Sequence, residues 1–194
     1  MTYELPDLLR RYGPPAPDLV ARVQALFGER VSLKNKAHFL RTGDRATTVG
    51  FVQAGVLRGY YVNPKGEEIT SNFFVAPTLV SDYAAYVAGA RTRLNIQALR
   101  PAELLTAPLA ALTTLADEHL ALSIVLRKFT EGVYLFQQQR MVSLIYDSAE
   151  TRYLDLLRSR PQVAAQVPQR YLASYLGIRP QSLSRIRRRL ARPG

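Results

Sequence analysis

The sequence predicts an α+β protein with an N-terminal antiparallel β domain, one long helix and a C-terminal helix-turn-helix. Three observations support this fold class. Short apolar runs broken by turn residues occupy much of the first half of the 194-residue chain. A heptad of mostly apolar residues follows them. The last part holds two short helical patterns that meet at Gly177, and the second of them is rich in arginine.

The β domain, with a helix at its N-terminal end, is predicted over residues 1–110. Helix is expected up to about residue 29, because Leu19, Val23 and Leu26 recur at helical spacing after a candidate cap at Asp18. From residue 31 onward, runs of about four to eight residues alternate with turn chemistry, which is typical of an antiparallel sandwich or barrel. The clearest hairpin joins VLRGYYV to EEITSNFF through the turn 63–66.

A single dimerisation helix is predicted over residues 111–138. The apolar positions, with His119 among them, are separated by alternating intervals of four and three residues, as in a coiled coil. An ordinary amphipathic helix on the chain's own core is the alternative. Ile124, Val125 and Tyr134 add a second apolar band, so the helix needs two partners, its own β domain and a second copy of itself. The predicted dimer seam consists of Leu115, Leu122, Leu126, Phe129, Val133 and Phe136.

The helix-turn-helix domain is predicted over residues 139–194. Gly177 permits the turn between the two helices, a small residue lets them cross closely, and apolar residues fill the angle between them. Pro180 suits the first turn of the second helix, where a missing N–H costs nothing. The predicted core consists of Leu172, Ala173, Leu176, Gly177, Ile178, Leu183 and Ile186.

The second helix presents a polar face opposite this core. Gln181 and Arg185 are the predicted base contacts, because Gln can bond adenine and Arg can donate two hydrogen bonds to guanine. The other basic and hydroxyl side chains are better placed for phosphates. The predicted phosphate contacts are Arg179, Ser182, Arg187, Arg188 and Arg189. A merely solvated run of arginines is the alternative interpretation.

The charge distribution supports a nucleic-acid partner. Residues 151–194 hold ten arginines, no lysine and one acid, Asp155, a charge of +9 out of the net +11. The chain has no cysteine, which excludes disulfides, Cys-ligated zinc and a thiolate-held iron–sulfur cluster. No signal peptide or long uncharged apolar run occurs, so we expect a cytoplasmic protein with no membrane contact.

Two stretches resemble the Crp/Fnr family of transcription regulators: SAETRYLDLL followed by YLASYLGIRPQSLSRIRRRL, and GVLRGYYVNPKGEEITSNFF. The resemblance implies a double-stranded β-helix (jelly roll) like that of cyclic-nucleotide-binding domains, then a dimer helix and a DNA-binding domain. By similarity, Gln181 and Arg185 fall on base contacts and Ser182 on a phosphate contact. The resemblance further implies a homodimer on a palindromic operator in double-stranded DNA, and contact with RNA polymerase is an added expectation. The short C-terminal ending is similar to compact members common in the Bacteroidetes group.

The chain departs from the family where a cyclic nucleotide would bind. No Gly-Glu follows Phe73-Phe74, and Arg91-Thr92-Arg93 replaces the Arg-Ser pair that holds the cyclic phosphate. We therefore expect no cofactor, and the effector is unidentified. Tyr83, Tyr86, Arg91 and Arg93 form the candidate effector pocket.

Neither a metal site nor catalysis is expected, since the chain has two histidines and none of the phosphate-loop or nucleophile-elbow motifs. The sequence thus predicts a transcription regulator that is not an enzyme. The alternative is a small-molecule sensor that acts through a protein partner and binds DNA only non-specifically.

Overall fold

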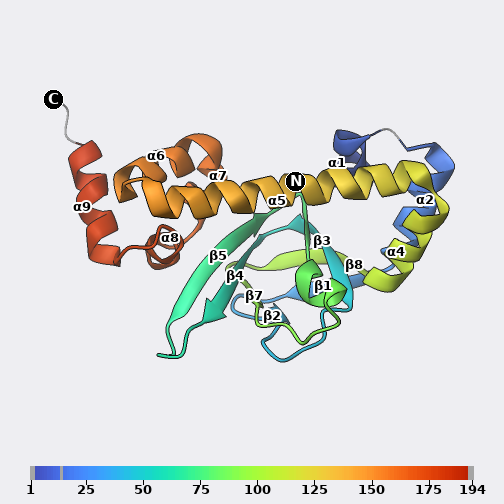
Figure 1. Cartoon of the computed structure of the whole chain (residues 1–194), viewed down its shortest axis with the longest axis horizontal. Coiled ribbons are helices and arrows are strands. Elements are labelled where there is room, and N and C mark those ends of the chain that lie inside the picture. Colours follow the sequence, from blue (N-terminus) through green and yellow to red (C-terminus); the bar gives the residue numbers. More distant parts are fainter. Residues whose placement is uncertain (1–2, 14, 192–194) are drawn as a thin grey trace.

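The structure of the chain is a computed structural model that describes residues 3–13 and 15–191. A long helix, α5, runs along one side of a β-sandwich (Figure 1). Three N-terminal and connecting helices, α1, α2 and α4, gather near one end of α5, and the C-terminal helices α6 to α9 gather near the other end. The predicted order of β domain, long helix and helical C-terminal part is confirmed.

The β domain consists of two antiparallel sheets of four strands each. One sheet has the order β1-β8-β3-β6 and the other has the order β2-β7-β4-β5. Side chains from both sheets, among them Val52, Leu57 and Ile96, fill the space between them and are fully buried. The strands are β1 (Glu29–Leu33), β2 (His38–Leu40), β3 (Thr48–Ala54), β4 (Val56–Val62), β5 (Glu68–Val75), β6 (Thr78–Val80), β7 (Asn95–Ala98) and β8 (Ala102–Pro108).

The hairpin predicted around the turn 63–66 joins β4 to β5, and its pairing begins at Val62 opposite Glu68. Asn63 organises the turn, since its Oδ1 accepts hydrogen bonds from the backbone N–H groups of Lys65 and Glu67, both at 2.9 Å. Gly66 has a φ of 80°, which favours glycine there. Strand β5 is an edge strand, since it pairs only with β4 in this sheet. The C-terminal helices lie against it.

The N-terminal region contains two helices rather than one, α1 (Leu5–Tyr12) and α2 (Pro17–Leu26). Each begins with a proline in its first turn, where the missing N–H removes no helical hydrogen bond. Their buried residues join α4 and the start of α5 in one core cluster.

The single helix predicted over residues 111–138 is in fact two helices, α4 (Leu109–Glu118) and α5 (Leu120–Tyr146). The break lies at His119, whose backbone is extended (φ −132°, ψ 100°). Heptad spacing continues across His119, so the sequence pattern does not reveal the break. Helix α5 also runs eight residues beyond the predicted end at residue 138, so the boundary of the C-terminal domain at residue 139 lies inside it.

Four shorter helices follow α5 and form the C-terminal part of the described chain. Ser148 begins the first of them as a helix cap, since its Oγ accepts a hydrogen bond from the N–H of Thr151 at 3.1 Å. The helices are α6 (Ala149–Ser159), α7 (Pro161–Gln166), α8 (Gln169–Tyr175) and α9 (Pro180–Leu190). The remaining residues of the predicted domain, 192–194, lie outside the described range.

Candidate nucleic-acid interface

Helices α8 and α9 form a helix-turn-helix whose centre is apolar. Leu172, Ala173 and Leu176 contribute from the first helix, and Leu183 and Ile186 contribute from the second. All five are buried, Ala173 and Leu183 completely. Ile178 is half-buried and packs against the same cluster. The structure therefore brings the predicted core residues together.

Gly177 forms the turn between α8 and α9. Its φ is +69°, in the left-handed region, where a side chain would be strained. The Ile178 N–H donates to the Ala173 carbonyl at 3.0 Å, and the Gly177 N–H donates to the Ser174 carbonyl at 3.1 Å. These two bonds close the end of α8 and reverse the chain into α9.

The exposed face of α9 forms a shallow hollow that is lined only by arginine, glutamine and serine side chains. Gln181, Arg185 and Arg188 are all exposed along it, and Ser182 and Ser184 are half-buried. Arg185 Nη2 lies 3.4 Å from Ser182 Oγ, near the start of the helix. The hollow is lined by Arg179, Gln181, Ser182, Ser184, Arg185 and Arg188. Three guanidinium groups with no carboxylate among the lining residues make this surface suited to an anion such as a phosphate backbone.

Several arginines that the charge count assigned to DNA have partners within the chain. Arg189, a predicted phosphate contact, forms an ion pair with Glu150 of α6. Arg152 donates to the Leu176 carbonyl from Nε at 3.1 Å and from Nη2 at 2.9 Å. Arg160 Nη2 donates to the Phe73 carbonyl at 2.5 Å. Arg187 is exposed, but it does not line the hollow. Arg152 and Arg189 thus join helices of the C-terminal part, and Arg160 joins that part to β5. The arginine surface left without such partners on α9 is smaller than the charge count suggests.

The predicted effector pocket is not assembled as expected. Tyr83 and Tyr86 stack with ring centroids 6.0 Å apart, but Arg91 and Arg93 are exposed on the loop before β7. Arg91 Nη1 instead donates to the Gly43 carbonyl at 2.7 Å. Only Tyr83 of the four lines a cavity. The prediction grouped residues that are near in sequence, whereas the cavity is built from distant ones.

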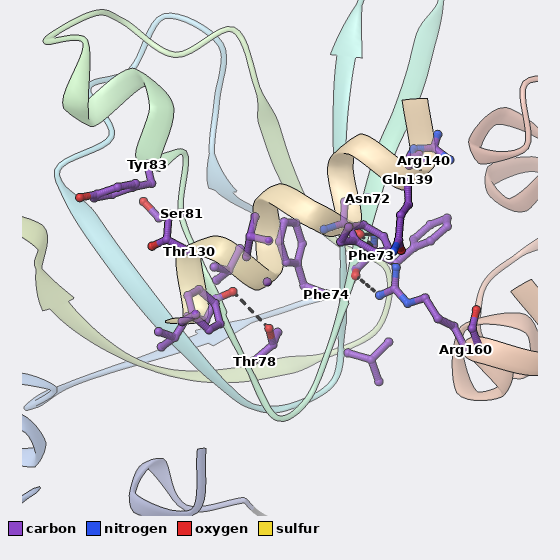
Figure 2. Close-up of a pocket in the computed structure, with 18 of the residues that line it drawn as sticks. Asn72, Phe73, Phe74, Thr78, Ser81, Tyr83, Thr130, Gln139, Arg140 and Arg160 are labelled. Carbon is purple, nitrogen blue, oxygen red and sulfur yellow. Dashed lines mark hydrogen bonds between the residues drawn. The ribbon is translucent and has the colours of Figure 1, made fainter. Parts of the chain in front are cut away.

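A cavity of about 970 Å³ lies between α5 and the strands β5 and β6. Figure 2 shows Phe73 and Phe74 of β5 facing it on one side, with Thr130, Gln139 and Arg140 on the α5 side. Burial lowers the pKa of Arg140 from its ordinary value, and the side chain of Tyr175 opposes that shift. Arg140 Nη2 also donates to the Tyr175 carbonyl at 2.7 Å. The lining is mainly apolar, with side-chain hydroxyls from Thr78, Ser81, Thr113 and Thr130 among them.

Asp82 occupies the place where a short helix could receive an anion. It caps α3 (Tyr83–Val87), since its Oδ1 accepts a hydrogen bond from the Ala85 N–H at 3.2 Å. Its Oδ2 accepts from Thr92 Oγ1 at 2.5 Å, and Thr92 is buried. A carboxylate at this helix start repels a phosphate group rather than binding it.

The predicted dimer seam faces the chain's own body. Leu115 and Leu122 are buried against α1 and α2, and Leu126 is half-buried there. Phe129 packs edge-on against Tyr12, with ring centroids 5.5 Å apart. Val133 and Phe136 line the cavity beside β5. This face of α5 therefore fits the alternative interpretation, an amphipathic helix that packs on the core of its own chain.

Within residues 3–13 and 15–191, the opposite face of α5 is largely exposed. Here too the positions alternate by four and three residues, and the largest apolar side chains are exposed by 76% at Leu120, 61% at Tyr134, 52% at Met141 and 69% at Ile145. We call this face the outer seam. It consists of Leu120, Ile124, Arg127, Glu131, Tyr134, Gln138, Met141 and Ile145. The predicted second band is divided between the two faces, since Val125 is buried in the chain's own core and Tyr134 lies on the outer seam.

Two absences hold for the described residues. Among residues 3–13 and 15–191, no set of three or more His, Asp or Glu side chains converges in a way that could hold a metal ion. Within the same ranges, no helix has the length and apolar character that crossing a membrane requires.

Comparison with known proteins identifies this fold in solved structures. FixK2 from Bradyrhizobium japonicum matches with a TM-score of 0.75 at 18% identity, over 84% of this chain and 83% of that one. CLP, a c-di-GMP-responsive global regulator of Xanthomonas campestris, matches with a TM-score of 0.68 at 16% identity, over 88% and 91%. The catabolite activator protein of Thermus thermophilus matches with a TM-score of 0.57 at 17% identity, over 96% and 90%.

No family model and no curated protein sequence matches the chain. The structural matches nonetheless confirm the fold that the Crp/Fnr resemblance implies, a β-roll followed by a long helix and a C-terminal helical domain.

Proposed function

We propose that this protein is a sequence-specific DNA-binding transcription regulator that reads the major groove with α9. The observation that carries this proposal is the polar face of α9, where Gln181, Arg185 and Arg188 are exposed on a helix whose other face is buried in the helix-turn-helix core. A helix presented in this way fits the width of the major groove of B-DNA.

The face of α9 supports a division of labour along the helix. Gln181 and Arg185 lie in its N-terminal half, which reads base edges in helix-turn-helix proteins. Arg188 lies one turn later, and Arg179 precedes the helix, so both are placed for phosphates. Arg189 is better described as a contact between α9 and α6, because Glu150 already pairs with it.

The working unit is proposed to be a homodimer formed through the outer seam. In a parallel pair of α5 helices, this heptad would bury Leu120, Tyr134, Met141 and Ile145 against the same residues of a second copy. Large exposed apolar side chains aligned along one helix face favour such a partner. Two α9 helices related by a two-fold axis would then read an inverted repeat with half-sites one turn of DNA apart.

The cavity between α5 and β5 is the proposed place for an effector, whose identity is open. Its mainly apolar lining favours a largely apolar effector, and Arg140, Arg152, Arg158 and Arg160 also line it and could pair with an anionic group on that molecule. An enzymatic role has no support from the groups that line it, and we propose that the protein regulates without catalysis.

The proposal is tested by selection from a random pool of duplex DNA at about 150 mM salt, where non-specific phosphate binding is weak. Enrichment of an inverted repeat with half-sites about 34 Å apart supports both the reading helix and the dimer. A parallel selection with the Arg185→Ala variant should lose the preference at one base pair of each half-site. A wild-type pool that stays random, with and without cell extract as a source of effector, contradicts sequence-specific reading.

A further inference from the structure

The helix-turn-helix is fixed to the open edge of strand β5 by side chains. Ser174 of α8 lies beside that edge, and its Oγ accepts a hydrogen bond from the Thr70 N–H at 2.9 Å. The same hydroxyl donates to the Glu68 carbonyl at 3.1 Å. One side chain of the DNA-reading domain thus takes the place that a neighbouring strand would occupy at a sheet edge.

Two arginines satisfy further carbonyls along this edge. Arg140 of α5 donates from Nη2 to the Thr70 carbonyl at 3.2 Å and to the Tyr175 carbonyl of α8 at 2.7 Å. Arg160, at the end of α6, donates to the Phe73 carbonyl and, from Nη1, to Asn72 Oδ1 at 3.1 Å. Figure 2 shows Arg140 and Arg160 approaching β5 from the helical side.

A buried cation joins the same two elements from the face of the sheet. Arg58 of β4 is 1% exposed, and its guanidinium lies 4.0 Å from the ring centroid of Tyr60 and 4.0 Å from that of Tyr171 in α8. Its Nη2 donates to Glu68 Oε2 at 2.5 Å. The planar guanidinium between two rings is a geometry that lysine cannot reproduce.

These contacts are directional, and some of them are incompletely satisfied. Arg58 Nε and Thr70 Oγ1 are buried and have no hydrogen-bond partner among the described residues. Unpaired buried polar groups weaken an interface relative to a fully bonded one. The docking also has an apolar part, since Val56 and Phe73 of the β domain share a buried cluster with Tyr175 of α8. Apolar packing is not directional, so the hydrogen bonds and the stacked cation set the angle, and the loss of one of them should shift the docked position measurably.

We infer that Ser174 and Tyr171, together with Arg58, are positioning residues that set where α9 lies relative to the rest of the molecule. This inference rests on the proposed function only for its consequence in DNA reading, since the docking itself is a property of the free chain. None of the three side chains lines the hollow on α9. They act on DNA reading through the placement of α8, to which α9 is joined by Gly177.

The first test measures the docking without DNA. Because the chain has no cysteine, Thr114→Cys on α4 and Gln162→Cys on α7 provide two exposed sites for spin labels. Labelled chain is mixed with excess unlabelled chain, and the label–label distance distribution is recorded by pulsed electron resonance. Ser174→Ala and Tyr171→Leu should each broaden the distribution or add a second distance, because the docking equilibrium constant falls about fivefold or more per lost contact.

Conservative variants separate positioning from general damage. Ser174→Thr keeps the hydroxyl and Tyr171→Phe keeps the ring over Arg58, so both should retain the wild-type distance distribution. Ser32→Ala is the matched control, since it removes a serine hydrogen bond from β1 that does not involve α8. Melting temperature is measured for every variant, and Tyr171→Leu is the second probe if Ser174→Ala does not fold.

The second test asks whether the same variants change the spacing of half-sites that the protein prefers. With a set of operators whose half-sites are moved apart or together by one base pair, wild type should favour one spacing. Ser174→Ala and Tyr171→Leu should lose that preference about fivefold while they keep the wild-type base preference within each half-site.

The outcomes distinguish the two ideas. Unchanged distances in both Ser174→Ala and Tyr171→Leu overturn the positioning inference, whatever happens on DNA. Changed distances in a chain that never selects a DNA sequence support the positioning inference and contradict the proposed function. Changed distances with an unchanged spacing preference overturn the assignment of these residues to DNA reading.

Discussion

At the scale of the residue, the two arginines Arg185 and Arg188 lie in one hollow but differ in their place along α9. Arg185 is near the start of the helix, beside Ser182, and Arg188 is about one turn further on. A helix in the major groove brings its first turns closest to the base edges and its later turns nearer the backbone. The two side chains should therefore contribute to different properties of DNA binding.

Arg185→Ala should cost about 1–3 kcal/mol at one base pair of each half-site and relax specificity there, because a bidentate contact to a base is lost. Arg188→Ala should weaken binding to all sequences alike and flatten the dependence of affinity on salt. Affinities for a panel of single-base operator variants, measured at several salt concentrations, check both expectations. If the two variants give the same profile across the panel, the division between base and phosphate contacts is wrong.

His38 makes the stability of the β domain sensitive to pH. Burial lowers the pKa of His38 from its ordinary value of about 6.5, and the nearby charges of Arg41 and Arg58 lower it further, against a smaller opposing effect of Glu68. The folded state thus binds a proton less readily than the unfolded state. The free energy of unfolding should fall as the pH drops below about 6.5.

Denaturant unfolding of wild type and His38→Gln between pH 5 and pH 8 measures this effect. Plotted against pH, the free energies of unfolding of the two chains should run parallel near pH 8 and diverge near pH 5. At the lower pH, only wild type has a histidine at position 38 that takes up a proton more readily in the unfolded state. Carboxylates titrate in both chains, so their contribution cancels in the difference. Parallel curves throughout contradict a lowered pKa at His38.

The exposed face of α9 could be predicted from the sequence better than the arginines that are paired within the chain. The positions of Gln181 and Arg185 follow from helical periodicity, and the structure exposes both. Periodicity could not reveal that Arg152, Arg160 and Arg189 have partners inside the chain, because those partners come from other elements. The Arg160 partner Phe73, for example, is a strand residue 87 positions earlier.

At the scale of the element, α5 has two apolar faces that the sequence reveals but does not assign. Leu122 is fully buried on the inner face, whereas Ile145 is 69% exposed on the outer one. Both faces have heptad spacing, so the pattern alone cannot say which of them meets the β domain. The tertiary fold decides, because α1 and α2 cover the inner face near the start of α5.

Ile145→Glu should dissociate the proposed dimer, because a carboxylate would be buried in the outer seam. We expect the dimer dissociation constant to rise at least about tenfold, a cost of about 1.4 kcal/mol or more. Sedimentation over a range of concentrations measures it. Ala121→Glu, at an exposed position of α5 outside the outer seam, is the control and should remain dimeric. A dimer of unchanged strength in Ile145→Glu rejects this face as the interface.

Gly177 is an element boundary where a side chain is poorly tolerated. At φ +69°, a residue with a Cβ pays about 1–2 kcal/mol, and the added carbon would also lie 3.3 Å from Leu144 Cδ2. Gly177→Ala should therefore lower the free energy of unfolding by about that amount, which chemical denaturation measures. Gly43→Ala, at φ +95° with nothing within 4 Å of the added carbon, isolates the backbone part of the cost.

At the scale of the whole molecule, the order of the parts could be predicted and their assembly could not. Turn chemistry, heptad spacing and the pattern around Gly177 are local signals, and each identified its part of the fold. The docking of α8 on β5 depends on contacts such as Thr70 with Ser174, which lie 104 residues apart. No local pattern encodes such a contact, and the cavity beside α5 was missed for the same reason.

The break at His119 separates α5 from α4, so α5 can tilt as one rigid rod about its own first turns. The helix is about 40 Å long at 1.5 Å per residue, and its first turns are clamped where Leu122 and Val125 are buried. The helix would pivot at this buried end, and near its other end Arg140 contacts the helix-turn-helix through the Tyr175 carbonyl. A tilt of about 4° at the buried end moves the tip by about 3 Å, close to the rise of one base pair. If a ligand that fills the proposed effector cavity tilts α5 by this amount, the C-terminal helices would move by about the rise of one base pair.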